Sequence, residues 1–249
     1  MMMHTRGRLR RRHARHWAVA ALTTIALTAC GDSTGLSDNR YDIEFDFSSD
    51  YQGWIPGFSD YPVGKEAEWA IGSALAPLPA PLDGTRKGIL LTGDNHSDDL
   101  FMYLTHEGTP LAPNARYAVR FQVMLATSAP KNCFGVGGAP GESVVLKVGA
   151  LPFAPARSVD GAGYYRANFD HGSQLSAGQN ATVLGNLATS NTNCSLARYE
   201  LKEFDTGAAP ILLTTTSTGK VWLVIGVDSG FEGTTAVYVT SARVSIEPQ

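Results

Sequence analysis

The sequence has few charged residues, only three cysteines and no long apolar run. Charged side chains make up 17% of the 249 residues, below the ~25% that is usual for soluble domains. No stretch reaches the ~18 consecutive apolar residues of a membrane-spanning helix. Hydrophobic residues nevertheless make up 43% of the chain, which suits a packed core and excludes wholesale disorder. The composition therefore predicts a globular domain.

The first thirty residues predict an export signal. Six arginines with no acidic partner precede a 13-residue apolar stretch at 17–29, a length typical of a signal peptide and too short for a bilayer. The stretch ends in the motif LTAC (27–30), which resembles the lipobox of bacterial lipoproteins. The resemblance implies cleavage after residue 29, lipidation of Cys30 with palmitate-type acyl chains, and the cell envelope, with the outer membrane favoured by Gly31 and Asp32. The alternative is a secreted protein with Cys30 free.

Charge argues against a nucleic-acid partner. Once the signal is removed, 14 Lys and Arg remain against 23 Asp and Glu, a net charge of −9. A nucleic-acid surface requires a basic patch, which this balance does not favour. Membrane attachment is expected through the lipid on Cys30 instead.

The other two cysteines, Cys133 and Cys194, predict a disulfide. In an exported chain an even pair is typical of a bridge, and closing a loop of about 60 residues stabilises the fold by roughly 4 kcal/mol in the chain-entropy model. The alternative is two buried free thiols. A structural zinc site is not expected, because it needs four ligands.

Alternating apolar and polar residues predict strands along 41–249, and no stretch shows helical periodicity. The clearest are 41–47 and 116–125, and further strands are expected at 89–92, 100–104, 143–148, 164–169, 198–204, 211–215, 220–227 and 235–246. In the last strand the apolar parity shifts between Val239 and Ala242, which predicts a bulge near Thr240 and Ser241. Turns separate the strands, so we expect an all-β antiparallel sandwich as one domain (41–249), after a signal peptide (1–29) and a lipidated tether (30–40).

Three blocks carry a resemblance to a known fold family. FDFSSDYQGW (45–54), LAPNARYAVRFQVML (111–125) and GKVWLVIGVDSGFEGTTAVYVTSARVSI (219–246) resemble the galactose-binding-like jelly roll of carbohydrate-binding modules. The resemblance implies a jelly-roll sandwich and a carbohydrate ligand. That family often has acidic residues in its final strand, one of which holds a structural calcium; Thr240 and Ser241 stand there in this chain. The chain is also similar to uncharacterised bacterial lipoproteins.

Two groups of residues are candidates for ligand binding. The segment YQGWIPGFSDYP (51–62) gathers Tyr51, Trp54 and Tyr61, whose rings offer stacking surfaces for sugars; we expect Tyr51 and Tyr61 to be exposed, whereas Trp54 is favoured as a plug of the sandwich end. The second group follows from strand parity, which points certain polar side chains outward. If their strands share a sheet they form a polar strip, and the alternative is a solvated face: Arg120, Gln122, Lys147, Tyr164, Arg166 and Asn168.

The densest acidic cluster is a candidate metal site. Asp94, Asn95, Asp98 and Asp99 supply oxygen ligands of the kind calcium prefers, and the alternative is a turn whose side chains cap their own backbone. No catalytic residue is assigned, and no cofactor other than this calcium is expected. We therefore expect a non-catalytic, membrane-anchored envelope protein that binds carbohydrate. The alternatives are a structural or protein-interaction module and, third, a glycan-active enzyme, whose two carboxylates the sequence does not place.

Overall fold

The computed structural model describes residues 40–97 and 99–249, and their regular elements are all β-strands. They belong to a compact unit that runs from Asp38 to Gln249. Among them there is no helix long and apolar enough to cross a membrane. The predicted signal peptide, Cys30 and Asp98 lie outside the described residues, so the lipid anchor stays a prediction.

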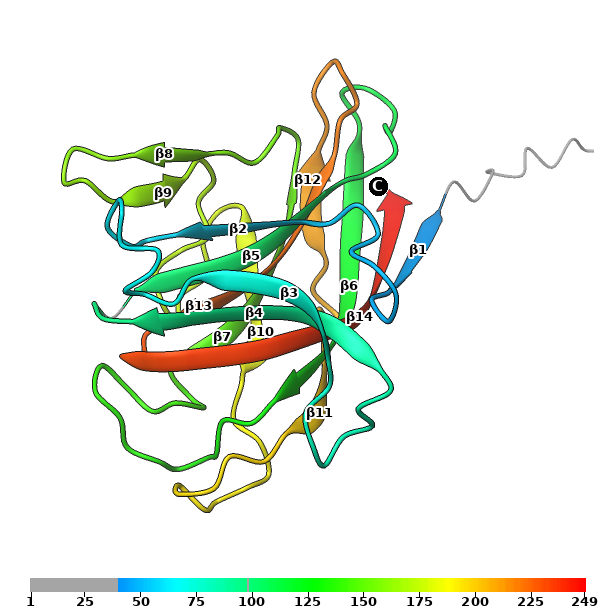
Figure 1. The fold of residues 1–249 in the computed structure, drawn as a ribbon. Coiled ribbons are helices and arrows are strands. Elements are labelled where there is room, and N and C mark those ends of the chain that lie inside the picture. The colour runs from blue at the N-terminus through cyan, green and yellow to red at the C-terminus, as the bar shows by residue number, and fades with distance from the viewer. Residues whose placement is uncertain (1–39, 98) are drawn as a thin grey trace, which may run out of the picture. The chain divides into compact units, whose positions relative to one another are not determined.

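The chain folds as an antiparallel β-sandwich of jelly-roll type (Figure 1). The larger sheet has the order β11-β6-β14-β4-β3, with β1 paired to β14 and β12 paired to β6. Its strands are β1 (Tyr41–Asp46), β3 (Gly72–Pro77), β4 (Lys87–Asn95), β6 (Arg116–Thr127), β11 (Glu200–Asp205), β12 (Ile211–Thr214) and β14 (Gly233–Pro248).

The smaller sheet has five strands in the order β10-β7-β13-β5-β2. These are β2 (Ile55–Ser59), β5 (Leu100–Glu107), β7 (Val144–Leu151), β10 (Ala181–Asn186) and β13 (Trp222–Ser229). A separate two-stranded hairpin is formed by β8 (Arg157–Val159) and β9 (Tyr165–Ala167), which lies beside β2 in Figure 1.

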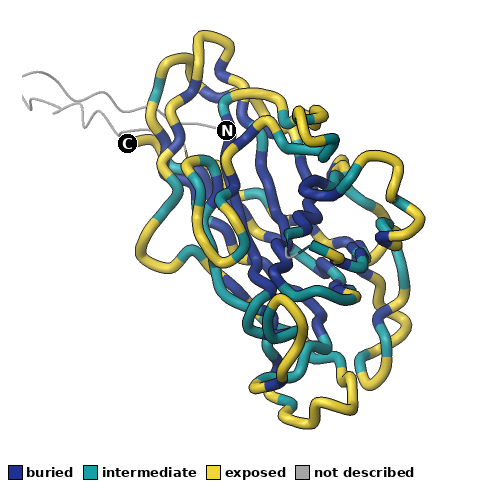
Figure 2. Tube along the Cα trace, turned by 90° about the vertical axis from the view of Figure 1, so that its left-hand side faces the viewer, coloured by how far each residue is buried: buried dark blue, intermediate teal, exposed yellow. Residues whose placement is uncertain are grey.

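Apolar side chains of both sheets fill the space between them, as strand alternation requires. In β6, Phe121 and Val123 are buried whereas Gln122 between them is exposed, and in β13 Leu223 and Ile225 are buried from the other sheet. Figure 2 shows the buried residues gathered along the strands and the exposed residues in the connecting loops.

The predicted bulge in the last strand is confirmed, and it marks a change of partner. The register of β14 against β6 shifts between Val239 and Ser241. On its other edge β14 pairs with β4 up to Val239 and with β1 from Ser241 onward. The extra residue at Thr240 therefore sits where one neighbouring strand ends and another begins, a place where bulges commonly redirect side chains.

The smaller sheet has a third layer on its outer face, formed by residues 152–180. Phe169 of this segment packs on Phe101, Tyr103, Leu151 and Val224, which point away from the main core. The backbone of Tyr165 bonds both ways with the chain at residues 60 and 61, at 2.7 and 3.0 Å. Both faces of the smaller sheet are therefore covered, which fits the continuous apolar character of β13.

Every strand predicted from alternation is present, although its ends shift by a few residues. Four strands were not predicted: β2, β3, β8 and β10. β2, β3 and β10 lie at sheet edges and β8 has three residues. β2 contains Pro56 and Gly57, which indicated a loop, but an edge strand tolerates a proline because one side of it has no partner.

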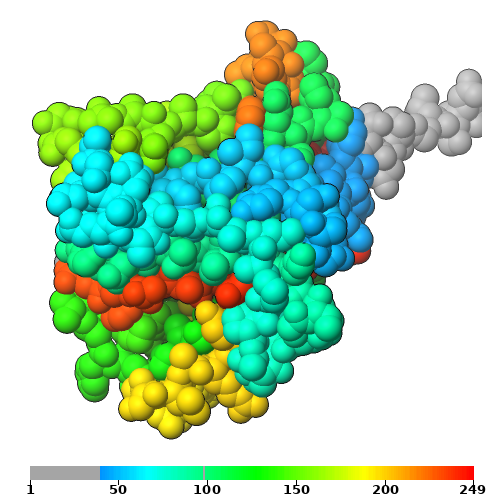
Figure 3. Space-filling model, in the orientation of Figure 1, coloured from blue at the N-terminus to red at the C-terminus, as the bar shows by residue number. Residues whose placement is uncertain are grey.

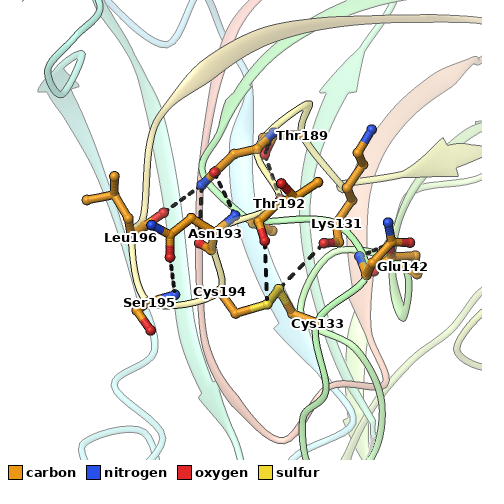
Figure 4. Close-up of a disulfide and its surroundings, with 12 residues drawn as sticks. Lys131, Cys133, Glu142, Thr189, Thr192, Asn193, Cys194, Ser195 and Leu196 are labelled. Atoms are coloured by element: carbon orange, nitrogen blue, oxygen red, sulfur yellow. Dashed lines mark hydrogen bonds between the residues drawn. A yellow bond between two sulfur atoms is a disulfide. The ribbon is translucent and has the colours of Figure 1, made fainter.

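The disulfide between Cys133 and Cys194 is confirmed, with Cα atoms 5.7 Å apart. It joins the loop after β6 to the loop before β11. Figure 4 shows hydrogen bonds around it, such as the one that the Ser195 amide donates to Asn193 Oδ1 at 3.0 Å. In addition, Asn132 N donates to Glu142 at 2.8 Å, and Asn191 Nδ2 donates to the carbonyl of Leu196 at 2.6 Å. The bridge therefore fixes two long loops at one end of the sandwich.

Candidate binding face

The outer face of the larger sheet carries rows of polar side chains from adjacent strands. In one row Glu44 of β1 faces Arg243 of β14, Arg243 faces Gln122 of β6, and Gln122 faces Asp205 of β11. These partners are linked, since Arg243 pairs with Glu44 and Gln122 donates to Glu203 in the next row. Cross-strand pairs of this kind hold polar groups in fixed positions.

A groove of about 580 Å³ opens on this face at the point where β14 changes partner. Its walls come from β1, β6, β11 and β14, with Gln52 and Arg86 added from loops. Five charged residues line it: Glu44, Asp46, Arg86, Glu203 and Arg243. The volume lies within the range of small-ligand sites, which is ~300–1,000 Å³.

A smaller hollow of about 180 Å³ continues the groove toward the β6–β12 side of the sheet and shares Gln122 and Arg243 with it. There β6 changes partner from β12 to β11, and Thr206 Oγ1 accepts from the Phe121 amide at 3.2 Å. Each depression therefore lies at a gap between two successive partners of one strand: β4 and β1 along β14 for the groove, and β12 and β11 along β6 for the smaller hollow.

A tyrosine pair lies on the same face, three residues along β14 from the groove-lining Ser241, and neither ring lines the groove itself. Tyr238 points outward from β14 between the buried Val237 and Val239, and its ring meets that of Tyr199 edge-on at 5.6 Å. Both rings are half-buried. Partial burial raises the pKa of Tyr238, with a smaller contribution from Tyr199. Rings held in this way offer an apolar surface beside polar groups, the combination found in small-molecule sites.

In Figure 3 part of β14 (red) is visible between the cyan-to-teal segments of β3 and β4 and the yellow segment that precedes β11.

Arg120 and Gln122 lie on this face, as the parity argument predicts. Gln122 lines the groove, whereas Arg120 lies beside it and pairs with Glu247 at 3.0 Å. The condition for one polar strip, that these two share a sheet with the strands of Lys147 and of 164–168, is not met. β6 belongs to the larger sheet, β7 to the smaller sheet, and β9 to the separate hairpin.

The prediction that Lys147 is accessible is wrong. Its side chain points out of the smaller sheet, but the third layer covers it and its side chain is 0% exposed. Lys147 Nζ donates to Asp228 Oδ2 at 2.7 Å and to the carbonyl of His171 at 2.8 Å. Strand parity correctly predicted that Lys147 points out of its sheet. It does not reveal that another layer packs on that face.

Arg166, Tyr164 and Asn168 hold the third layer in place. Arg166 lies between carboxylates, 2.6 Å from Asp60 and 2.9 Å from Asp160, and its guanidinium lies over the ring of Tyr164. Asn168 accepts from the amide of residue 156 and donates to the carbonyl of residue 154. The polar side-chain groups of Arg166 and Asn168 are therefore used within the protein.

His171 belongs to this layer and completes a charge network between it and the smaller sheet. Its Nε2 lies 3.1 Å from Asp60, its Nδ1 lies 3.4 Å from Asp228, and its ring stacks on Phe101 at 4.0 Å. Burial alone would lower the pKa of His171, but the two carboxylates outweigh it and raise the pKa to about 9. Burial also opposes ionisation of Asp60, yet His171 and Arg166 hold the pKa of Asp60 below its usual value.

Asp99 belongs to the same network, but its pKa is raised, whereas that of Asp60 is lowered. Burial, and then the negative charges of Asp60 and Asp228, raise the pKa of Asp99 to about 7. Its Oδ1 is buried without a hydrogen-bond partner, and Arg166 is 3.9 Å from its other oxygen. A buried carboxyl oxygen with no donor favours the neutral form.

The aromatic segment around β2 is mostly core. Trp54 is 2% exposed and its ring packs edge-on against Phe45 at 5.2 Å, so the plug interpretation is confirmed and its ring is not accessible to a ligand. The prediction that Tyr61 is exposed is wrong: it is 0% exposed, and its hydroxyl accepts from Arg157 at 2.8 Å. Tyr51, which was also predicted to be exposed, is half-buried and packs against the core. The alternation of apolar and polar residues does not reveal that the third layer covers Tyr61.

The predicted calcium ligands have separate partners where they are described. The amide of Asn95 is buried and donates to the carbonyl of Ser229 at 2.7 Å, and Asp94 accepts from Thr234 at 3.1 Å. Asp99 lies in the network described above. Within residues 40–97 and 99–249, no group of three or more His, Cys, Asp and Glu side chains is placed to hold a metal ion. With Asp98 undescribed, the calcium site stays a prediction.

Several residues of the face were not singled out in the sequence, among them Glu44, Tyr199, Glu203, Tyr238 and Arg243. A signal existed for two of them. The same parity that predicts the bulge turns Tyr238 outward between Val237 and Val239, and turns Arg243 outward between Ala242 and Val244. Tyr199 precedes β11, and no periodic pattern indicates where its ring lies.

No protein-family model and no curated protein sequence matches this chain. Solved structures show a weak similarity to it. The CBM22-1 xylan-binding domain of Paenibacillus barcinonensis Xyn10C is 10% identical, with 83% of this chain and 92% of that chain covered and a TM-score of 0.36. TmCBM27, a module described for specific mannan recognition, is 11% identical with coverages of 83% and 97% and a TM-score of 0.37. The K1 cleaved adhesin domain of Lys-gingipain from Porphyromonas gingivalis W83 is 9% identical, with coverages of 82% and 97% and a TM-score of 0.37. Similarity this weak carries no conclusion about the ligand.

Proposed function

We propose that this protein is a non-catalytic carbohydrate-binding lipoprotein, held in the bacterial envelope through Cys30, and that its ligand binds on the outer face of the larger sheet. The observation that carries the proposal is the groove of about 580 Å³ beside the Tyr199–Tyr238 pair. Sugars present hydroxyls at their edges and C–H groups on their faces. A site for them therefore needs polar groups and an aromatic surface within reach of one ligand.

The polar groups suit hydroxyl recognition. The groove offers carboxylate acceptors in Glu44 and Glu203, guanidinium donors in Arg86 and Arg243, and the amide of Gln122, which both donates and accepts. Because cross-strand pairs position Arg243 and Gln122, little side-chain entropy is lost on binding. Three carboxylates against two guanidinium groups favour a neutral glycan over an acidic one.

A screen of neutral polysaccharides, including xylan and mannan, with the soluble domain 38–249 tests this proposal. For a glycan that the screen retains, Tyr238→Ala is expected to raise the Kd at least tenfold, equivalent to about 1.4 kcal/mol. The matched control is Tyr164→Ala, which removes a similarly half-buried tyrosine from the third layer and is expected to leave the Kd unchanged. If no glycan is retained by the folded domain, or if the control weakens binding as much as Tyr238→Ala does, the proposal is wrong.

A further inference from the structure

A second hollow lies at the disulfide end of the larger sheet, where β14 before Tyr238 and the chain after Ala126 are no longer paired. It has a volume of about 260 Å³. Residues 127–130 at the end of β6, Cys194 and Ala197 before β11, and residues 234–237 at the start of β14 form most of its lining. One wall therefore belongs to the loop that the disulfide fixes.

The order of residues along the strands places the tyrosine pair between the two hollows. On β14, Val237 lines the second hollow and Ser241 lines the groove, with Tyr238 between them. On β6, Thr127 lines the second hollow and Met124 lines the groove, with residue 126 between them. Ala197 and Glu203 likewise flank Tyr199 in the third segment. One ligand lying along this face would therefore cross the groove, the two rings and the second hollow in turn.

The two hollows differ in chemistry. Five charged residues line the groove, whereas none of the described residues that line the second hollow is charged. Two hydroxyls in it are already used, since Thr127 donates to the carbonyl of Leu187 at 3.3 Å and Thr235 lies 3.4 Å from the hydroxyl of Ser229. Leu187 and Val237 are each 1% exposed, so the deepest part offers hydrocarbon. Such a hollow favours a small neutral group over a free hydroxyl or a charge.

We propose that the second hollow binds a small acyl substituent, an O-acetyl group, on the glycan whose sugar rings occupy the groove. This inference rests on the proposed function. Burying one methyl group is expected to tighten binding about fourfold. The glycan class is therefore a neutral polysaccharide that carries O-acetyl esters.

The disulfide makes this second subsite dependent on redox state. Cys194 lines the hollow, and its bond to Cys133 ties the 190–197 loop to the loop that supplies Pro140 on another wall. Backbone bonds from Lys131 to Asn191 and from Thr189 to Ala129, both 2.8 Å, also join the loops. Loss of the bridge is expected to loosen this wall and to leave the groove intact, because no residue from 128 to 197 lines the groove.

Calorimetric titration of the domain 38–249 with matched oligosaccharides tests the inference. The probes are O-acetylated xylan and mannan oligosaccharides and the same preparations after mild alkaline deacetylation. We expect about fourfold tighter binding of the acetylated form. Ala236→Leu, which fills the second hollow, and the double variant Cys133→Ser/Cys194→Ser are expected to abolish this preference while the deacetylated form binds as before. The control Ala74→Leu enlarges an exposed alanine on β3 and is expected to retain the preference.

The outcomes separate the two proposals. Equal affinity of the wild type for both forms, with binding present, overturns the acyl subsite and leaves the proposed function standing. Absence of binding to either form by a folded domain overturns both. A preference that survives in Ala236→Leu shows that the acetyl group binds elsewhere and overturns the assignment to this hollow.

Discussion

The buried pair of Lys147 and Asp228 allows a stability prediction of defined size. Both side chains are 0% exposed, and the ammonium donates to Asp228 at 2.7 Å and to the carbonyl of His171 at 2.8 Å. Lys147→Met keeps most of the side-chain volume but removes both bonds, and of the two cations beside Asp228 in the described structure it leaves His171. Breaking a buried pair by removing one partner costs about 3–5 kcal/mol. That is a large share of the ~5–15 kcal/mol by which domains are stable.

Denaturant unfolding followed by tryptophan fluorescence measures this loss. The matched control is Lys220→Met, because Lys220 pairs with Glu107 at 3.2 Å and is 54% exposed; an exposed pair contributes ~0–1 kcal/mol. The double variant Lys147→Met/Asp228→Leu is expected to recover part of the loss, since it leaves no unpaired carboxylate. A loss below about 1 kcal/mol for Lys147→Met would refute the description of this pair as buried and mutually dependent.

Three further predictions concern the network, the disulfide and the anchor. Asp99 and His171 hold protons more tightly in the folded chain, with pKa values near 7 and 9 against 3.8 and 6.5 when unperturbed, so the free energy of unfolding should fall as pH rises from about 4 to 9. Chemical denaturation at intervals across this pH range measures the free energy of unfolding, and a rise of this free energy with pH would contradict the network. His171→Phe should flatten the dependence of the unfolding free energy on pH above pH 6.5. Removing the disulfide with Cys133→Ser/Cys194→Ser should lower the free energy of unfolding by about 4 kcal/mol. Chemical denaturation measures this loss, and an unchanged denaturation midpoint would show that the bridge does not restrict the unfolded chain. Cys30→Ser should yield an unprocessed, unlipidated precursor by mass spectrometry, whereas a normally cut product without lipid would contradict the anchor.

Strand alternation was a sufficient guide to the sandwich because burial between two sheets imposes a period of two. The shift of parity after Val239 even located the bulge, since a single extra residue is the way a strand keeps its apolar side chains inward. The same rule failed for β2, where Pro56 and Gly57 conceal an edge strand.

The site was harder to predict because it depends on which strands become neighbours. Gln122 was correctly turned outward, but its partners Arg243 and Glu203 come from strands 121 and 81 residues away in sequence. Lys147 and Tyr61 were predicted to be accessible, but residues 152–180 fold over the smaller sheet and cover them. The regular structure of that layer consists of β8 and β9, which have three residues each and are too short to show a clear pattern in the sequence.

Amide chemical-shift mapping of the 38–249 domain, titrated with a retained glycan, shows whether the ligand binds on the outer face of the larger sheet. If it does, the shifted resonances cluster at Gln122, Glu203, Tyr238 and Arg243, and the third layer is unaffected. Shifts centred instead on Tyr164, Arg166 and Asn168 would contradict binding on that face.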